Sequence, residues 1–250
     1  MAQYLVFRLY GPLASWGLPA VGGDRQTGIA PSRSAILGLL SASLGINRKD
    51  ESKLLQLQQS VLVATKQLVP SMLLRDFHTA QVPSKRKNIT HPTRRSELAE
   101  KDQNTILSSR DYRCDAIWII AIKLTGHSQY TLEQLKNALL KPALLKPVYI
   151  LSLGRKSCPL SLPMMPKIVE VEQLKEALDT QFPYITTSDK ADSYWFHSDG
   201  WVTYFWEGNY QDIKGENIMT LYPWDDPINR QHWQFRQRKM YQMSVKRESE

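Results

Sequence analysis

Apolar stretches alternate along the chain with glycine-rich or polar segments, and their spacing predicts a mixed α+β protein. The segment 3–9 alternates apolar and polar residues, so we expect a strand that buries one face, formed by Leu5, Phe7 and Leu9. Apolar residues then recur at helical spacing over 31–44, and Gly45 stands where a helix C-terminal cap is expected. The chain therefore opens with strand, loop and helix.

A polar interruption follows the next helix and strand. The pattern predicts a short helix at about 50–59, a strand through 61–65 and a further extended piece near 73–78. Residues 79–110 contain almost no large apolar side chains, so they cannot bury a core face of their own. We therefore expect a projecting arm, such as a hairpin.

The apolar pattern resumes after this arm. The continuous apolar run 115–124 predicts a central strand, and Thr131 with Gln134 forms a capping box before the next helix. A last strand is expected at 148–153, ending in Gly154. Strand-helix-strand, an excursion, and strand-helix-strand again is the order of a ferredoxin-like or RRM-like sheet.

The last third of the chain differs in character. A short helix is expected near 172–178, and Asp199-Gly200 between two aromatic runs is a hairpin signal. Five of the seven Trp residues lie between Trp195 and Trp233. We predict a palm at 1–165 and a small, aromatic, β-rich part at 166–250, whose rings we assign to packing rather than to base stacking.

Length and composition narrow the class of protein. The chain has 250 residues, 42% hydrophobic and 22% charged, as expected for a folded domain. No apolar run reaches the roughly 18 residues of a membrane span, and the first residues do not resemble a signal peptide, so we expect a cytoplasmic protein without membrane contact. Cys114 and Cys158 form no CxxC pair, which predicts reduced thiols.

The charge favours a polyanionic partner. Lys and Arg total 32 against 24 for Asp and Glu, a net charge of +8. Two stretches, 82–95 and 229–247, carry many cations and no acid, and the second interleaves them with aromatic rings. Cations that bind phosphates and rings that stack on bases suit single-stranded nucleic acid, although each stretch is also compatible with a solvated charged surface.

Glycine concentrates near the start of the chain. Seven of the twelve glycines precede position 46, and most lie in the loop after the first strand. A glycine-rich backbone can approach a ligand closely, so we interpret this segment as a binding loop; the alternative is a merely irregular loop. Neither GxxxxGK[ST] nor GxGxxG occurs, so the usual nucleotide-binding loops are not indicated.

Catalytic and metal motifs are scarce. The five histidines show neither HxxxH nor HExxH spacing, and no GxSxG elbow occurs, so we expect no metal and no cofactor. One enzymatic alternative is a metal-independent ribonuclease, with His78 or His91 as general base beside the cations 85–87. A DNA-binding transcription factor is disfavoured because no helix-turn-helix is visible.

Several motifs carry a family resemblance. The segment YLVFRLYGPLASWGLPAVGGDRQTGIAPSRSAILGLLSASLGI (4–46) resembles the opening of the type I-E branch of the fifth family of CRISPR-associated (Cas) proteins. LLRDFHTAQ, RDYRCDA and LLKPVYILSLGRKSCPL follow in the family's order, and RQHWQF matches loosely near the end. These motifs span most of the first 160 residues.

The resemblance implies a subunit of a type I-E Cascade surveillance complex that serves antiviral DNA targeting. It implies a modified ferredoxin-like or RRM-like palm with an inserted basic thumb at about 76–113, which holds the crRNA 5′ handle. The implied neighbours are the CasC backbone filament, which the subunit closes at one end, and the large subunit CasA, with target DNA engaged through the assembled complex. In this branch the subunit is non-catalytic; in the type I-C branch the related subunit cuts precursor crRNA.

The resemblance also implies which residues bind RNA. Phosphate contacts on the thumb would come from its cations, and stacking from His78 or Tyr112. The candidates for the handle pocket lie in the glycine loop and in the GRKS motif, and Arg33 has the alternative of capping or salt-bridging the first helix. We assign Trp16 and Cys158 to packing. The full candidate set is Arg25, Thr27, Arg33, His78, Lys85, Arg86, Lys87, Arg94, Arg95, Arg110, Tyr112, Arg155, Lys156 and Ser157.

Overall fold

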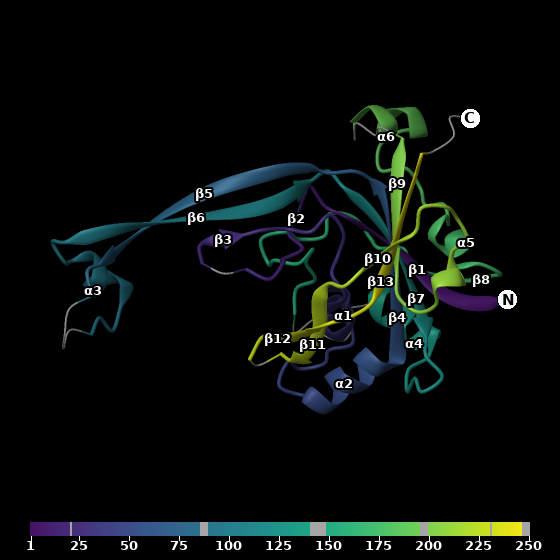
Figure 1. The fold of residues 1–250 in the computed structure, drawn as a ribbon, viewed down its shortest axis with the longest axis horizontal. Helices are drawn as coiled ribbons and strands as arrows, with labels where there is room; N and C mark the ends of the chain where they lie inside the picture. Colours follow the sequence, from purple (N-terminus) through teal and green to yellow (C-terminus); the bar gives the residue numbers. More distant parts are fainter. Residues whose placement is uncertain (21, 86–89, 141–148, 196–199, 231, 247–250) are drawn as a thin grey trace.

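A seven-stranded antiparallel sheet forms the body of the protein (Figure 1). The computed structural model describes residues 1–20, 22–85, 90–140, 149–195, 200–230 and 232–246. Across the sheet the strands follow the order β10 (Met219–Leu221), β13 (Met240–Lys246), β9 (Trp201–Trp206), β4 (Val61–Val69), β7 (Ile117–Leu124), β1 (Ala2–Tyr10) and β8 (Lys167–Val171). Strands from both sides of residue 165 therefore share one sheet.

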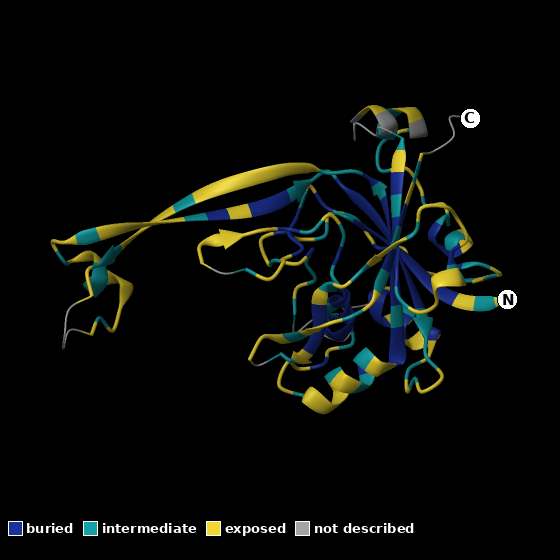
Figure 2. Ribbon diagram, in the orientation of Figure 1, coloured by how far each residue is buried: buried dark blue, intermediate teal, exposed yellow. Residues whose placement is uncertain are grey.

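The sheet is covered on both faces, which explains the nearly continuous apolar character of its central strands. In β1, Leu5 and Phe7 point to one face while Tyr4 and Val6 point to the other, and all four are buried (Figure 2). Helices α1, α2 and α4 pack on the first face and α5 on the second. The helices are α1 (Arg33–Ser43), α2 (Glu51–Ser60), α3 (Arg94–Leu98), α4 (Leu132–Leu140), α5 (Leu174–Leu178) and α6 (Asp189–Trp195), with a 3-10 turn at Tyr210–Asp212.

The capping residues in the sequence predicted the end of helix α1 and the starts of helices α1 and α4 correctly. The Ser32 side chain accepts a hydrogen bond from the Ala35 amide, and Gly45 has a φ of 70° after the last turn of α1. At the start of α4, the Thr131 amide donates to the Gln134 side chain at 2.9 Å and the Gln134 amide to Thr131 at 3.1 Å, so the predicted capping box is confirmed.

The polar segment forms a long hairpin that projects from the body. Strands β5 (Met72–Pro83) and β6 (Gln103–Cys114) pair antiparallel along their whole length, with α3 in the connection at the far end (Figure 1). This arm is longer than the short extended piece expected near 73–78. The sequence pattern predicted a projecting arm but not the length of its strands, because most of β5 is exposed to solvent and imposes no apolar alternation (Figure 2).

A second, smaller sheet forms at the root of the arm. The two-residue strands β2 (Leu13–Ala14) and β3 (Asp24–Arg25) both belong to the loop after β1, and both pair with β6. The glycine-rich loop is therefore attached to the arm by backbone hydrogen bonds. It is an ordered platform rather than an irregular loop.

Two expected elements are wrong. Residues 149–154 form no strand, because the chain turns at Gly154 and the Leu153 amide bonds to the Cys158 carbonyl; the strand beside β1 is β8 instead. The first strand of the hairpin expected at Asp199-Gly200 is not formed where the structure describes it, because Tyr194 and Trp195 belong to helix α6; residues 196–199 lie outside the described residues. At 149–154, leucines that pack into the core from a loop resembled a strand in sequence.

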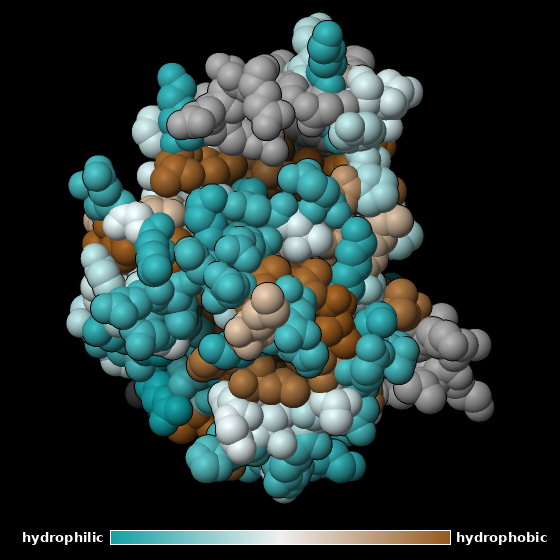
Figure 3. All heavy atoms as spheres, turned by 90° about the vertical axis from the view of Figure 1, so that its right-hand side faces the viewer, coloured by the Kyte–Doolittle hydropathy of each residue, from teal (hydrophilic) through white to brown (hydrophobic). Residues whose placement is uncertain are grey.

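The surface away from the arm is mostly hydrophilic. Figure 3 shows this side, where apolar side chains lie in patches among polar ones. Scattered apolar residues of this kind are normal for a folded domain. Among the described residues, no helix combines the length and apolar character that crossing a membrane requires.

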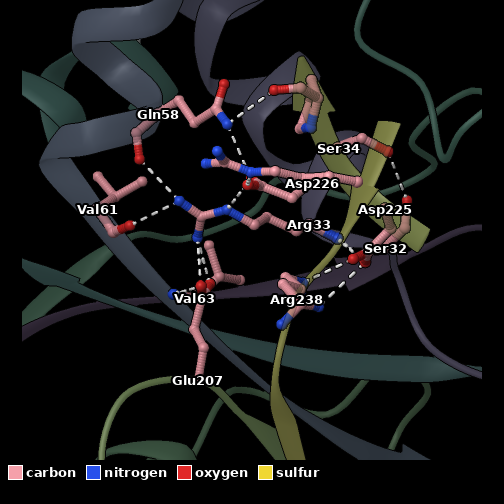
Figure 4. A network of polar contacts seen from close by, with 12 residues as sticks. Ser32, Arg33, Ser34, Gln58, Val61, Val63, Glu207, Asp225, Asp226 and Arg238 are labelled. Atoms are coloured by element: carbon pink, nitrogen blue, oxygen red, sulfur yellow. Dashed lines mark hydrogen bonds and ion pairs between the residues drawn. The ribbon is translucent and has the colours of Figure 1, made fainter. Parts of the chain in front are cut away.

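A buried ionic network fastens the C-terminal hairpin, β11 (Trp224–Asn229) and β12 (Gln234–Gln237), to helix α1 (Figure 4). The Arg33 guanidinium contacts Glu207 at 2.5 Å and Asp226 at 3.0 Å. It also donates to the backbone carbonyls of Gln58 in α2 and Val61 in β4. Arg238 bonds to both carboxylate oxygens of Asp225, at 2.6 and 3.0 Å. These side chains are largely withdrawn from solvent, so their charges depend on one another.

Replacing Glu207 with Ala should therefore destabilise the fold strongly. The change leaves the Arg33 charge buried with fewer partners, and we expect a loss of about 3–5 kcal/mol in the free energy of unfolding, measured by urea denaturation. As a control, Glu133→Ala removes an exposed carboxylate that pairs with Lys136 at 3.4 Å, and it should cost less than about 1 kcal/mol. Equal effects of the two variants would show that the network contributes no special stability.

Candidate RNA-binding surface

Three segments that are distant in sequence meet at the root of the arm. They are the loop 11–28 after β1, the base of β6 and the loop 151–160. The Ser15 amide donates to the Leu153 carbonyl at 3.0 Å, and Ser15 Oγ donates to the Asp111 carbonyl at 3.1 Å. Backbone contacts thus hold all three segments in one position.

Glycines permit this close approach at two points. Gly154 has a φ of 88°, and a Cβ there would lie 1.9 Å from the Ser15 carbonyl oxygen. A Cβ on Gly23 would lie 2.8 Å from the Leu107 carbonyl oxygen on β6. A side chain at either position would push the loops apart.

The joined loops form an open hollow of about 430 Å³ with a strongly basic lining. Its wall includes three arginines and no acid; the lining residues are Gly23, Arg25, Ser108, Arg110, Arg155 and Ser157. Arg25 and Arg110 come from the paired strands β3 and β6 and are exposed. Within the described part of the chain, neither guanidinium has a hydrogen bond or an ion pair.

This arrangement suits a polyanion. Guanidinium groups without internal partners keep all their donors for a ligand, and planar pairs of donors match phosphate oxygens. Serine hydroxyls in the same wall can add neutral hydrogen bonds. The sequence pointed to four of the six lining residues individually and to Gly23 as part of the glycine-rich binding loop. Ser108 was missed because a single serine on a polar strand carries no signal for a ligand site.

The third arginine of the hollow is positioned by an aromatic ring. The Arg155 Cζ lies 5.6 Å from the centre of the Tyr112 ring, and Arg155 Nη1 donates to Tyr112 Oη at 3.4 Å. Tyr112 is itself buried in the main core. The prediction that Tyr112 stacks on a base is therefore corrected: its ring packs and orients Arg155.

Two other candidates belong to the interior. Thr27 is only 5% exposed, and its hydroxyl accepts from the Trp16 amide at 2.8 Å while donating to the Gly28 carbonyl. Arg33 is 7% exposed, so its alternative assignment as an ionic anchor of the first helix is the correct one. Trp16 and Cys158 are buried, as predicted for packing.

The candidates on the arm are divided. Lys85 and Arg95 are exposed, whereas Arg94 pairs with Glu97 at 2.5 Å and bonds to the Gln81 carbonyl. His78 lies on β5, with its Nε2 2.7 Å from an Asp76 carboxylate oxygen. Lys156 is exposed beside the hollow; Arg86 and Lys87 lie outside the described residues.

The base of the arm is stabilised by a carboxylate that the sequence did not single out. Arg75 on β5 forms two hydrogen bonds to Asp111 on β6, at 2.8 and 3.0 Å. These bonds hold the pKa of Asp111 below its ordinary value. Arg113 donates to the Gly28 carbonyl at 3.1 Å, which ties the glycine loop to the same strand.

Metal-binding geometry is not found in the described segments, where no three His, Cys, Asp or Glu residues cluster. Cys114 and Cys158 are both free thiols. Burial raises the pKa of each of them, more strongly than nearby charges and hydrogen bonds change it. Neither thiol is thereby activated as a nucleophile.

Comparison with known proteins identifies the class. Residues 4–241 match the family model described as CRISPR-associated protein (Cas_Cas5). The chain therefore belongs to the Cas5 family of CRISPR-associated proteins, as the motifs of the first 160 residues predict. A curated relative, the CRISPR system Cascade subunit CasD of Escherichia coli (strain K12), is 37% identical over 186 residues, which cover 71% of this chain and 76% of the relative.

Solved structures share the fold. One described as a CRISPR RNA-guided surveillance complex contains a chain with a TM-score of 0.63 and 22% identity, covering 98% of this chain and 90% of that one. Another, described as the crystal structure of a Cas protein, has a TM-score of 0.60 and 22% identity over 98% of this chain and 95% of its own. This chain thus shares its mixed α+β fold, dominated by antiparallel sheet, with these two chains.

The glycine at the turn provides a test of the platform. Gly154→Ala should cost at least about 2 kcal/mol in the free energy of unfolding, because alanine tolerates a positive φ poorly and its Cβ would overlap the Ser15 carbonyl. Urea denaturation measures the loss. In Gly126→Ala the new Cβ meets nothing within 4 Å, so that control should stay near wild type; two variants of equal stability would contradict the close approach.

Proposed function

We propose that this protein is a non-catalytic RNA-binding subunit of a type I-E Cascade complex, in which it binds and caps the crRNA 5′ handle. The observation that carries the proposal is the acid-free hollow with three arginines at the root of a basic arm. The similarity to the E. coli subunit supports membership in such a complex. Single-stranded RNA would enter the hollow with its phosphates on Arg25, Arg110 and Arg155.

The body of the protein would act as a palm and the arm as a thumb, each with its own RNA contacts. We interpret the strands β8, β1, β7 and β4, with α1 and α4, as a ferredoxin-like palm, because two strand-helix-strand units interleave in that order. The arm is inserted between β4 and β7 and would act as the thumb. Lys85 and Arg95 on it would contact phosphates further along the RNA, together with Arg86 and Lys87 of the same basic run, and His78 would stack on a base.

The arm also offers surface for other subunits. Phe77 on β5 and Leu107 on β6 are 76% and 72% exposed, an unusual solvent exposure for large apolar side chains on a hairpin. CasC at one end of the backbone filament and the large subunit CasA are the partners that we propose, and target DNA would be reached only through the assembled complex. The site of action would be the cytoplasm.

The second candidate function is cleavage of precursor crRNA without a metal, as in the type I-C branch. It would need a general base next to the ribose 2′-OH and a cation for the developing charge. His78 Nε2 lies 2.7 Å from an Asp76 carboxylate oxygen, and this proximity of a histidine to a carboxylate is what favours the alternative. Binding without cleavage is favoured because the basic hollow has no histidine in its lining.

Removing two arginines from the hollow should weaken RNA binding and reduce its salt dependence. For Arg25→Ala with Arg110→Ala, we expect the slope of log affinity against log salt to fall by about 0.7 for each lost phosphate contact. Filter binding of labelled repeat RNA at several salt concentrations measures both effects. Lys190→Ala with Lys214→Ala removes the same charge from exposed sites elsewhere, and an equal slope change there would contradict a specific site.

Cleavage is tested separately. Purified protein incubated with labelled repeat RNA in the presence of a metal chelator should give a mobility shift and no shorter products. Discrete products that disappear in His78→Ala would overturn the non-catalytic assignment and support the alternative. Discrete products that persist in His78→Ala would overturn it as well, and would direct attention to His91.

A further inference from the structure

A second hollow adjoins the first and has a different character. This groove of about 700 Å³ lies between helix α1, the loop 149–155 and the hairpin β11–β12. Its lining is largely apolar and aromatic, with Tyr149, Trp233 and Phe235, and it holds three arginines, Arg48, Arg155 and Arg230, but no acid. A groove of this size and lining is typical of small-ligand sites.

Two of its arginines lie close together without a counter-charge. Arg48 Nη2 donates to the Arg230 backbone carbonyl at 2.9 Å, and Arg230 Nη2 donates to the Ser34 carbonyl at 3.4 Å. No carboxylate among the described residues pairs with either guanidinium. Burial, and then the Arg48 charge, lower the pKa of Arg230. Arg48 is exposed and Arg230 is half-buried, so water screens their repulsion only in part, and an anion bound between them would offset the remainder.

An aromatic face lies beside these cations. Trp233 is 67% exposed, and the Arg48 guanidinium lies over one face of its ring, with Cζ 4.2 Å from the ring centre, so a base would stack on the other face. Its φ of 52° is an uncommon conformation for a bulky residue, and such conformations concentrate at functional sites. The buried network of Arg33 and Asp226 holds the hairpin that presents this ring (Figure 4).

We propose that this groove binds one nucleotide of a single-stranded RNA, with the base stacked on Trp233 and the phosphate held by Arg48 and Arg230. A flat ring beside unpaired guanidiniums is complementary to a base joined to a phosphate. An acidic peptide would satisfy the cations, but it would not use the exposed flat ring as well. The occupant is therefore the nucleotide.

The groove is continuous with the basic hollow of the proposed function. Arg155 lines both, and a third depression shares Arg25 and Arg155 with the hollow and Arg155 and Trp233 with the groove. This depression is also lined by Asp225, whose carboxylate is paired with Arg238. An RNA strand with phosphates on Arg25 can thus place a neighbouring base in the groove. The inference rests on the proposed function because it takes the same RNA as the ligand.

Abasic substitution tests the stacking. The probe is fluorescein-labelled repeat RNA, intact or with one abasic nucleotide placed at each position in turn, bound to the full-length protein and followed by anisotropy. With wild type, one position should lose about tenfold or more in affinity when the base is removed. Trp233→Ala should lose a similar factor with intact RNA and nothing further with that abasic RNA. Trp233→Tyr should restore most of the affinity.

Controls separate this inference from the proposed function. Trp201→Ala removes a comparably exposed tryptophan on β9 that does not line the groove, and it should bind as wild type; urea denaturation checks that each variant folds. If Trp233→Ala binds all probes like wild type while Arg25→Ala with Arg110→Ala does not, the groove inference falls and the proposed function stands. If none of these variants alters binding, both fall.

Two further outcomes would also overturn the groove inference. A uniform loss of affinity for every abasic probe in Trp233→Ala would mean that the ring holds the hairpin in place and stacks on no base. Unchanged RNA binding, together with loss of a co-purifying protein from Trp233→Ala, would identify a peptide as the occupant.

Discussion

The position of Arg33 is the constraint on which much of this structure depends. A guanidinium removed from water must find acceptors for its donors, and here they come from Glu207 after β9, Asp226 in β11 and one carbonyl each in α2 and β4. The first helix can satisfy this requirement only when the C-terminal hairpin packs against it. The same contact places Trp233 and Arg230 opposite the loop 149–155, so one buried ion accounts both for the attachment of the hairpin β11–β12 to helix α1 and for the position of the groove.

A second constraint is steric, and it operates at the root of the arm. Gly154 and Gly23 allow three backbones to approach so closely that no side chain fits between them. As a result, Arg25, Arg110 and Arg155 share one hollow although they are far apart in sequence. Their mutual repulsion is a cost that the free protein carries, and the packing of Arg155 on Tyr112 holds one of the charges in place. Such an arrangement is stable because the fold is stabilised elsewhere, by the core on both faces of the sheet.

The sequence predicted those features of the structure that depend on interactions between residues close together in the chain. Helix caps such as Thr131 with Gln134, and buried strands such as β1, depend on neighbours a few residues away, and both were predicted. The arm was expected, but its strand lengths were not, since solvent-exposed strands carry no apolar alternation. The segment 149–154 was mistaken for a strand because its leucines pack into the core from a loop. For the site, Arg25, Arg110 and Arg155 were predicted and share one wall, whereas the roles of Thr27, Arg33 and Tyr112 depend on burial, which only the tertiary fold reveals.

The second acid-free stretch of the sequence shows that a run of basic residues need not form a basic surface, because the fold can bring carboxylates from elsewhere next to it. In the second stretch, Arg236 pairs with Asp226 and Arg238 pairs with Asp225. Both carboxylates precede the stretch in sequence, and the pairing of β11 with β12 brings them next to these arginines. Much of the expected basic field there is neutralised, yet Arg230 in the same stretch keeps its charge without a carboxylate partner among the described residues. A basic side chain indicates an anion-binding site only where the fold places no carboxylate beside it. By that criterion, the hollow at the root of the arm and the groove beside it form one surface for the proposed RNA ligand, with arginines that lack carboxylate partners among the described residues and an exposed ring at one end.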